Sequence, residues 1–146
     1  MNELHIWAQR WGIPFEALGE LPGILTPATS MPVGEKSEEA VKARVRLEAS
    51  QKGILLWRNN VGVAQDPTGR VVRFGLANDS SKLNKEIKSA DLIGLRPDTG
   101  QFIARETKRV DWSYRGSSPE KAQLKFLLIV QSKGGDACFA KGIGTL

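Results

Sequence analysis

The fold is decided by residues 90–108, which have the sequence ADLIGLRPDTGQFIARETK. Residues 90–95 and 101–108 have the apolar pattern of β-strands. The segment between them, RPDTG at 96–100, places a proline at a favoured corner of a tight turn. We therefore predict two strands joined as a hairpin.

This hairpin brings together three side chains that can carry chemistry. Glu106 and Lys108 are two residues apart on the second strand, so their side chains point to the same face. Asp91 stands at the start of the first strand, and the reversal of the chain brings it beside the end of the second. Two carboxylates with little else around them are the oxygen ligands that Mg²⁺ or Mn²⁺ prefers. Such an ion lowers the pKa of a bound water and neutralises charge on a phosphate, and a nearby lysine stabilises the same transition state.

The remaining sequence alternates between helix and strand signals. One helix is predicted from the N-cap residue Ser37 to Gly53, and another from Ser118 to Gly134. A buried strand is predicted at 54–57, a turn at 66–69 and a further strand at 70–74, and these three together suggest a second hairpin. A loop with a helical turn is predicted at 75–90 and a last strand at 137–140. This order predicts the α/β class, with a mixed central β-sheet flanked by helices.

An N-terminal arm precedes the body of the chain. Residues 1–36 form the predicted helical arm and linker, and residues 37–146 form the predicted second domain, which is the body of the chain. Apolar residues recur in the arm at spacings of three or four, which predicts one or two short amphipathic helices. These residues are Trp7, Trp11, Phe15, Leu18 and Leu21. We expect so aromatic an arm to pack on the body or on a second subunit.

Composition narrows the function further. The chain has 146 residues and a net charge of +5, from 21 Lys and Arg against 16 Asp and Glu. This balance favours a polyanionic partner, either nucleic acid or an anionic membrane surface. Cys138 is the only cysteine and His5 the only histidine, which excludes an internal disulfide and argues against histidine catalysis. No apolar run could span a membrane and no secretory signal is recognisable, so we expect a soluble, cytoplasmic protein.

The predicted hairpin resembles the core of the PD-(D/E)XK nucleases, and more narrowly their VRR-NUC branch, which includes small stand-alone phage and bacterial nucleases. The resemblance rests first on residues 89–94 and 102–108. That branch also has a glutamate near the start of a helix, an apolar strand ending in Trp-Arg-Asn, a glutamine-bearing helix and a Gly-Gly pair before the last strand. These features match residues 37–41, 57–60, 123–127 and 134–137. The resemblance covers residues 37–142 and implies a DNA endonuclease, a branched or junction-type DNA substrate, a homodimer, and a bacterial or phage-infected host cell.

The resemblance also implies roles for individual residues. The metal-binding groups would be Glu38, directly or through water, Asp91, Glu106 and the backbone carbonyl of Thr107. Lys108 would be the catalytic lysine, and Gln123 would support the site from the later helix. The cofactor would be Mg²⁺ or Mn²⁺, with no organic cofactor.

The sequence departs from the family pattern at two positions. Ala90 replaces the usual proline before the first aspartate, and Thr107 replaces the commoner valine. In addition, Glu38 and Glu39 both stand near the start of the helix. We prefer Glu38 because valines follow it three and seven residues later, on its side of the helix.

Basic residues outside the hairpin are candidates for binding the phosphates of DNA. They are Arg58, Arg70, Arg73, Lys82, Lys85, Lys88 and Arg109. Trp112 and Tyr114 either stack on unpaired bases or pack on the domain.

Each candidate residue also has an ordinary explanation. Glu106 and Lys108 could form a surface ion pair, and Asp91 could cap or pair at a strand edge. Glu38 could be no more than a first-turn acid that interacts favourably with the helix dipole. Two other functions therefore stay open: a nucleic-acid-binding module without catalysis, and a component of a larger DNA-processing assembly that docks through the arm.

Overall fold

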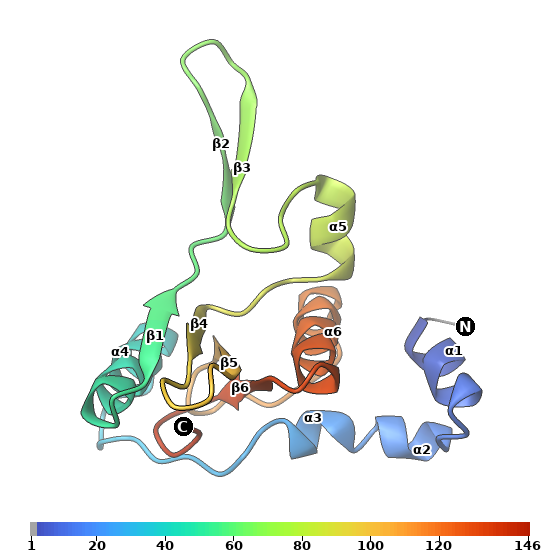
Figure 1. Ribbon diagram of the computed structural model, residues 1–146, viewed down its shortest axis with the longest axis horizontal. Coiled ribbons are helices and arrows are strands. Elements are labelled where there is room, and N and C mark those ends of the chain that lie inside the picture. The colour runs from blue at the N-terminus through green and yellow to red at the C-terminus, as the bar shows by residue number, and fades with distance from the viewer. Residues whose placement is uncertain (1–2) are drawn as a thin grey trace.

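The computed structural model describes residues 3–146 and shows a mixed central sheet with helices around it (Figure 1). The helices are α1 (Glu3–Arg10), α2 (Phe15–Leu18), α3 (Leu21–Ile24), α4 (Glu38–Gln51), α5 (Ser81–Glu86) and α6 (Ser118–Ser132). The strands are β1 (Leu55–Arg58), β2 (Gly62–Gln65), β3 (Val71–Phe74), β4 (Leu92–Leu95), β5 (Phe102–Thr107) and β6 (Asp136–Ala140). The predicted α/β class is confirmed. In the described part of the chain, no helix has the length and apolar character to cross a lipid bilayer.

The central sheet has the order β1-β4-β5-β6. β4 pairs antiparallel with β1 and with β5, whereas β5 pairs parallel with β6. The predicted hairpin at 90–108 is confirmed, with Leu92 opposite Arg105 and Leu95 opposite Phe102. Because β5 has a strand on each side and a helix on each face, its residues from 103 to 107 are all buried.

Two helices cover opposite faces of the sheet (Figure 1). α4 packs Val45 on one face, in a cluster with Leu92. α6 packs Leu127 on the other face, in a cluster with Ala104. Because the side chains of a strand alternate between its faces, Glu106 lies on the α6 side with Ala104.

Serine caps open both long helices. The predicted N-cap Ser37 is confirmed, since its hydroxyl accepts the N–H of Ala40 at 3.1 Å. α6 begins at Ser118 as predicted, and a reciprocal capping box at Ser117 and Glu120, which the sequence reading did not name, opens it. Gly53 follows α4 with a φ of +69°, a left-handed conformation that glycine adopts without strain.

The prediction of a buried strand at 54–57 is wrong. β1 is an edge strand, and the side chains of Leu55 and Trp57 are about half exposed, at 47% and 51%. A short apolar run does not by itself distinguish an edge strand from a central one. β1 still packs closely on β4, since any side chain at Gly94 would collide with the carbonyl oxygen of Leu55.

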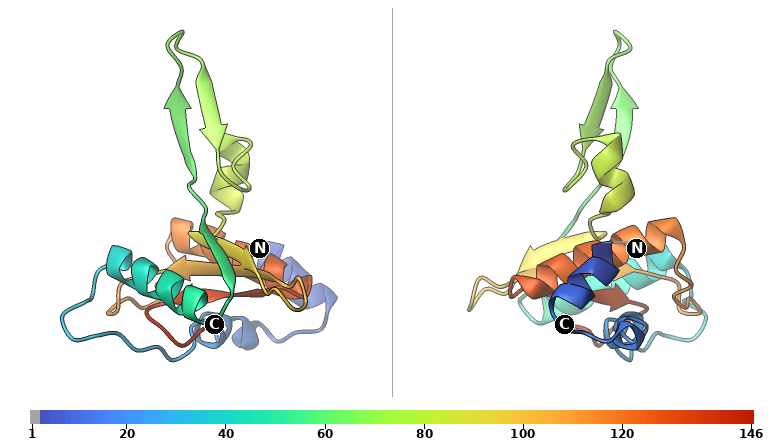
Figure 2. Two further views of the ribbon diagram at one scale, coloured as in Figure 1. Left: turned by 60° about the vertical axis from the view of Figure 1, so that its left-hand side comes forward. Right: turned by 90° about the vertical axis from the view of Figure 1, so that its right-hand side faces the viewer.

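The predicted strand at 70–74 exists as β3, but it lies outside the central sheet. It pairs with β2, which the sequence reading missed because Gly62 and Ala64 have low strand propensity. The predicted turn at 66–69 is confirmed, and Asp66 Oδ1 accepts the N–H of Arg70 at 2.9 Å. Residues 62–74 form a projecting hairpin that stands away from the body (Figure 2).

Two asparagines hold the base of the projecting hairpin. The side chain of Asn78 is buried and donates to the carbonyl oxygens of Gly62 and Phe74 at 2.8 and 2.9 Å. Asn59 accepts the N–H of Leu76 at 3.1 Å. Because each asparagine joins segments distant in the sequence, the hairpin is anchored firmly at its base although it projects into solvent.

The arm contains short helices, as predicted, and it contacts the body. Leu18 and Leu25 are buried, and the Leu25 carbonyl accepts the N–H of Phe139 at 2.8 Å. Trp11 is largely exposed. Packing of the arm on the body is therefore confirmed, and docking on a second subunit stays a prediction. The side chain of His5 lies outside the described part of the chain.

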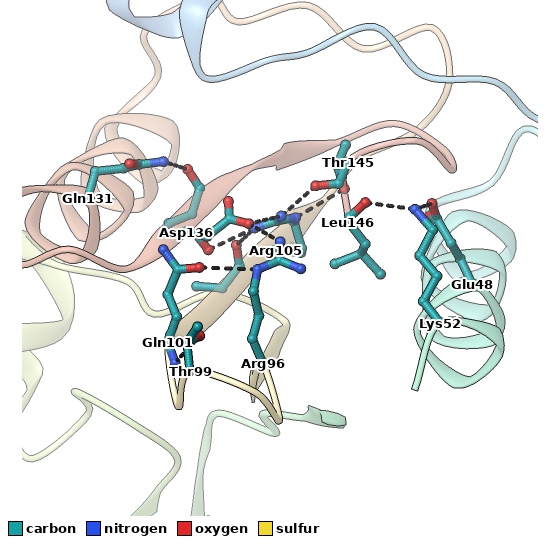
Figure 3. A network of polar contacts seen from close by, with 12 residues as sticks. Glu48, Lys52, Arg96, Thr99, Gln101, Arg105, Gln131, Asp136, Thr145 and Leu146 are labelled. Atoms are coloured by element: carbon teal, nitrogen blue, oxygen red, sulfur yellow. Dashed lines mark hydrogen bonds and ion pairs between the residues drawn. The ribbon is translucent and has the colours of Figure 1, made fainter. Parts of the chain in front are cut away.

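Arg105 is a fully buried charged residue at the centre of a polar network (Figure 3). Its guanidinium donates to Asp136 Oδ2 at 2.9 Å and to the Thr145 carbonyl at 2.6 Å. Arg96 donates to the same Asp136 oxygen at 2.5 Å. The network joins β5 to β6 and to the segment after β6.

Candidate active site

Asp91 and Glu106 lie at neighbouring strand ends. Each is one residue beyond the paired residues Leu92 and Arg105. Asp91 is fixed by Thr107, whose N–H and hydroxyl both donate to its Oδ2, at 3.1 and 2.6 Å. The carboxylate of Asp91 therefore stays beside the last residues of β5.

Glu106, Lys108 and Gln123 form a closed hydrogen-bonded group. Glu106 Oε1 accepts from Gln123 Nε2 at 2.8 Å and lies 3.4 Å from Lys108 Nζ. Lys108 Nζ in turn donates to Gln123 Oε1 at 2.8 Å. The two charged groups come from the end of β5, and the glutamine comes from the first half of α6. The side chain of Gln123 therefore positions both the Glu106 carboxyl and the Lys108 ammonium.

Burial strongly affects the ionisation of Glu106. Only 4% of this residue is exposed, and burial raises the pKa of its carboxyl to about 8. The negative charge of Asp91 contributes further, and Glu38 adds a smaller effect in the same direction. The ammonium of Lys108 opposes the rise without cancelling it. Without a bound cation the Glu106 carboxyl is therefore mainly protonated at neutral pH, because one ammonium does not offset its burial and the charge of Asp91.

Lys108 is also surrounded by aromatic rings. Its Nζ lies 5.6 Å from the centre of the Trp112 ring and 6.0 Å from that of Phe139. Trp112 packs 4.8 Å from Phe139, and its indole N–H donates to Glu120 at 3.0 Å. Of the two roles considered for Trp112 and Tyr114, packing on the domain is confirmed.

The first turn of α4 faces the carboxylates from the other side of the sheet. Glu38 is half-buried, and its charge reaches Glu106. Glu39 is exposed and forms an ion pair with Lys42 at 2.9 Å. This difference favours Glu38 as the helix glutamate of the site.

Two clefts open on either side of Asp91. The main cleft lies between the carboxylates and the base of the projecting hairpin, and its lining residues include Arg73, Asn84, Lys88, Glu106 and Gln123. The side cleft lies between α4 and the end of β1, and it is lined by Glu39, Lys42, Arg58, Asn59, Asn60, Val61 and Asp91. Both clefts have Asp91, Asn59 and Val61 in their linings, so they adjoin at Asp91, and together they are called the groove below.

Only some of the predicted phosphate-binding residues line this groove. Arg58 lines the side cleft, and Arg73 and Lys88 line the main cleft. The guanidinium of Arg73 already donates to the side-chain oxygen of Asn78 at 2.9 Å, so it also fastens the hairpin. The other predicted residues of the described chain, Arg70, Lys82, Lys85 and Arg109, are exposed but line neither cleft.

Sequence reasoning missed Lys42 and the asparagines of the groove. Lys42 follows Glu38 by four residues on α4, a spacing that places the two side chains on one helix face. That spacing could have revealed it. Nothing in the local sequence marks Asn78 or Asn84, because their positions depend on how the projecting hairpin and α5 pack.

The donor groups of the site suit a divalent metal ion. No group of three acidic, histidine or cysteine side chains in residues 3–146 is close enough to hold an ion by itself. Asp91 and Glu106 do supply two neighbouring carboxyl groups, a bound cation would favour the ionised form of Glu106, and the carbonyl of Thr107 lies on the same strand end. Mg²⁺ keeps several waters and binds through one or two carboxylates, so this set fits such an ion.

The chain matches no model of a known protein family, no curated protein and no solved structure.

Proposed function

We propose that this protein is a metal-dependent DNA endonuclease that hydrolyses phosphodiester bonds. The observation that carries the proposal is the meeting of Asp91, Glu106, Lys108 and Gln123 at one end of the β4–β5 hairpin. Two acids and an amine on adjacent strand ends, supported by an amide, form a set suited to phosphoryl chemistry. A groove with cations along it passes this set.

The residues have distinct roles in the proposed reaction. Asp91, Glu106 and the Thr107 carbonyl hold the ion, and Glu38 contributes from α4. A bound Mg²⁺ or Mn²⁺ supplies a Lewis acid that lowers the pKa of a water and offsets charge on the phosphate. Lys108 holds the attacking water or stabilises charge on the phosphate, because Gln123 keeps its ammonium beside Glu106.

We also propose the PD-(D/E)XK architecture of the VRR-NUC type for residues 37–146. It is supported by the order of elements: a helix with an acidic first turn, the antiparallel β4–β5 pair, a glutamine-bearing helix, and a last strand parallel to β5. By the same resemblance, we propose branched or junction DNA as substrate, and a homodimer.

The proposed activity is tested by incubating pure protein with linear, flap and four-way-junction DNA, with Mg²⁺, Mn²⁺ or EDTA. We expect cleavage that needs the metal and favours a branched substrate. The variant Lys108→Met should lose at least about a hundredfold in rate while it stays folded, since it removes one group that stabilises transition-state charge. Metal-independent binding without cleavage would instead support the non-catalytic binding module.

The proposed homodimer has a separate test. Light scattering on the eluate of a sizing column should give twice the chain mass of 16.0 kDa. The mass of one chain across a range of protein concentrations would contradict the dimer and leave the nuclease proposal intact.

A further inference from the structure

We propose that the side cleft is a phosphate subsite, in which Lys42 binds a backbone phosphate next to the one that is cut and Glu39 competes with that phosphate for Lys42. The inference rests on the proposed nuclease function, because it assumes that a DNA strand follows the groove past Asp91. It assigns a role to Lys42, a residue that the sequence pattern did not single out.

The position of Lys42 is the first argument. Its side chain lines the side cleft and is 17% exposed, so most of it is packed on the protein, and its ammonium donates to Glu39 at 2.9 Å. Burial by itself lowers the pKa of its ammonium, but Glu39, Asp91 and Glu38 outweigh burial and raise it. Lys42 is therefore a fixed positive charge at the edge of the carboxylate site, on the side away from Lys108.

The other groups in the side cleft also suit a phosphate. Arg58 supplies a second positive charge, and Asn60 is an uncharged polar residue of the same lining, whereas the amide of Asn59 already donates to Ser89 and to the Ala90 carbonyl. Guanidinium and amide groups are common phosphate ligands in protein–DNA interfaces. Asp91 lines the cleft too, and in the proposed function a metal ion offsets its charge.

Glu39 is the side chain that would compete with a phosphate for Lys42. It accepts a hydrogen bond from Lys42 at 2.9 Å, and its side chain is 74% exposed. Within the described chain, the hydrogen bond from Lys42 is the one that holds this carboxylate. An arriving phosphate can therefore displace it into water at little cost, since exposed ion pairs are weak.

The competition predicts opposite effects for neighbouring substitutions. Lys42→Gln should weaken DNA binding several-fold and reduce the slope of log K against log salt by about 0.9, the effect of one lost phosphate contact. Glu39→Gln should strengthen binding, because it frees Lys42. The double variant should bind like Lys42→Gln, because the gain from Glu39→Gln acts through Lys42.

The experiment uses the full chain and a fluorescent 20-base-pair duplex, titrated by anisotropy in Ca²⁺, which fills an oxygen-ligand site and so offsets the charge of Asp91, at several salt concentrations. Arg46→Gln is the matched control: it removes one charge from an exposed position on the same helix. Kinetics in Mg²⁺ with the same duplex, or with a branched substrate that is cut, should show a raised KM for Lys42→Gln and a nearly unchanged kcat.

Two results would overturn the subsite. One is a Lys42→Gln variant that binds with the affinity and salt slope of Arg46→Gln. The other is a Glu39→Gln variant that binds no better than wild type. A wild-type protein that cuts no DNA, but whose variants show the opposite effects on binding, would refute the nuclease function and still support the subsite.

Discussion

Glu106 in β5 is a buried carboxyl group and Asp136 in β6 is a half-buried one, and their electrostatic surroundings are opposite. Burial pushes the pKa of Asp136 upward, but Arg105 and then Arg96 outweigh it and hold this pKa below its ordinary value. For Glu106, burial and the charge of Asp91 outweigh Lys108, and the pKa rises to about 8. Asp136 pairs with two guanidinium groups, whereas Glu106 pairs with one ammonium and has the charge of Asp91 nearby.

The comparison separates a structural ion network from a candidate site. In the Asp136 network both guanidinium groups donate to the one carboxylate, so that carboxylate is fully paired (Figure 3). The Glu106 carboxyl has one ammonium beside it, in a position that opens into a cleft, and its raised pKa means that its ionised form is stabilised less than that of Asp136. Strongly shifted pKa values of this second kind are concentrated at functional sites.

The largest expected effect is on catalysis, at Glu106. Glu106→Gln keeps the shape of the side chain but removes the charge that would hold the ion. We expect metal-dependent cleavage to fall by about a thousandfold or more, because a metal ion contributes several kcal/mol to transition-state stabilisation. The measurement is single-turnover cleavage of a labelled branched DNA. Retention of a tenth of the wild-type rate would contradict the role.

The substitution Asp136→Asn should instead lower the stability of the protein. It leaves the guanidinium of Arg105, which is fully buried, without its carboxylate partner. The free energy of unfolding should fall by about 3 kcal/mol, the lower end for a broken buried pair, because Asp136 is partly exposed. Urea unfolding followed by circular dichroism measures this change. A loss under about 1 kcal/mol would show that the network is dispensable.

Above about pH 4.5, Glu106 and not Asp136 should make stability depend on pH, because the lowered pKa of Asp136 acts only in more acid solution. A carboxyl whose pKa is raised on folding stabilises the protein fully below about pH 4.5, and that contribution is lost as pH rises through about 8. Metal-free wild type should therefore lose up to about 1.4 kcal/mol of stability for each pH unit in this window, and Glu106→Gln should not lose that part. Urea unfolding at a series of pH values tests this. Equal slopes for the two proteins would contradict it.

The smallest effect is expected at Gln123. Gln123→Leu removes the side chain that joins Glu106 to Lys108 while filling similar space. Loss of a group that orients metal ligands typically costs about 10–100-fold in activity or metal affinity. Mg²⁺ titration of the cleavage rate separates a loss of metal affinity from a loss of maximal activity. Gln131→Leu is a matched control, because Gln131 lies on the same helix but donates to the Ala137 carbonyl.

Local patterns were enough to predict the parts of the fold that depend on neighbouring residues. The β4–β5 hairpin, the cap at Ser37 and the turn at 66–69 are all confirmed, because strand pattern, capping and turn chemistry act over a few residues. The meeting of Asp91 with the end of β5 follows from the same hairpin.

The parts that sequence reasoning missed depend on distant contacts. The exposure of β1 depends on its place at the sheet edge, and the separate sheet of β2 and β3 depends on a strand with weak local signals. Arg105 reaches Asp136 and Thr145, which are 31 and 40 residues away. No local pattern marks such an arginine as buried.

The projecting hairpin has a consequence for how this protein can change over evolution. Its base is joined to the rest of the chain through Asn59 and Asn78, while Asp91 and Glu106 are held by the sheet and by α6. Insertions or deletions in the turn at 66–69 would therefore leave the carboxylates in place. Natural selection can lengthen, shorten or recharge this hairpin, and so change what the groove binds, without altering the proposed catalytic residues.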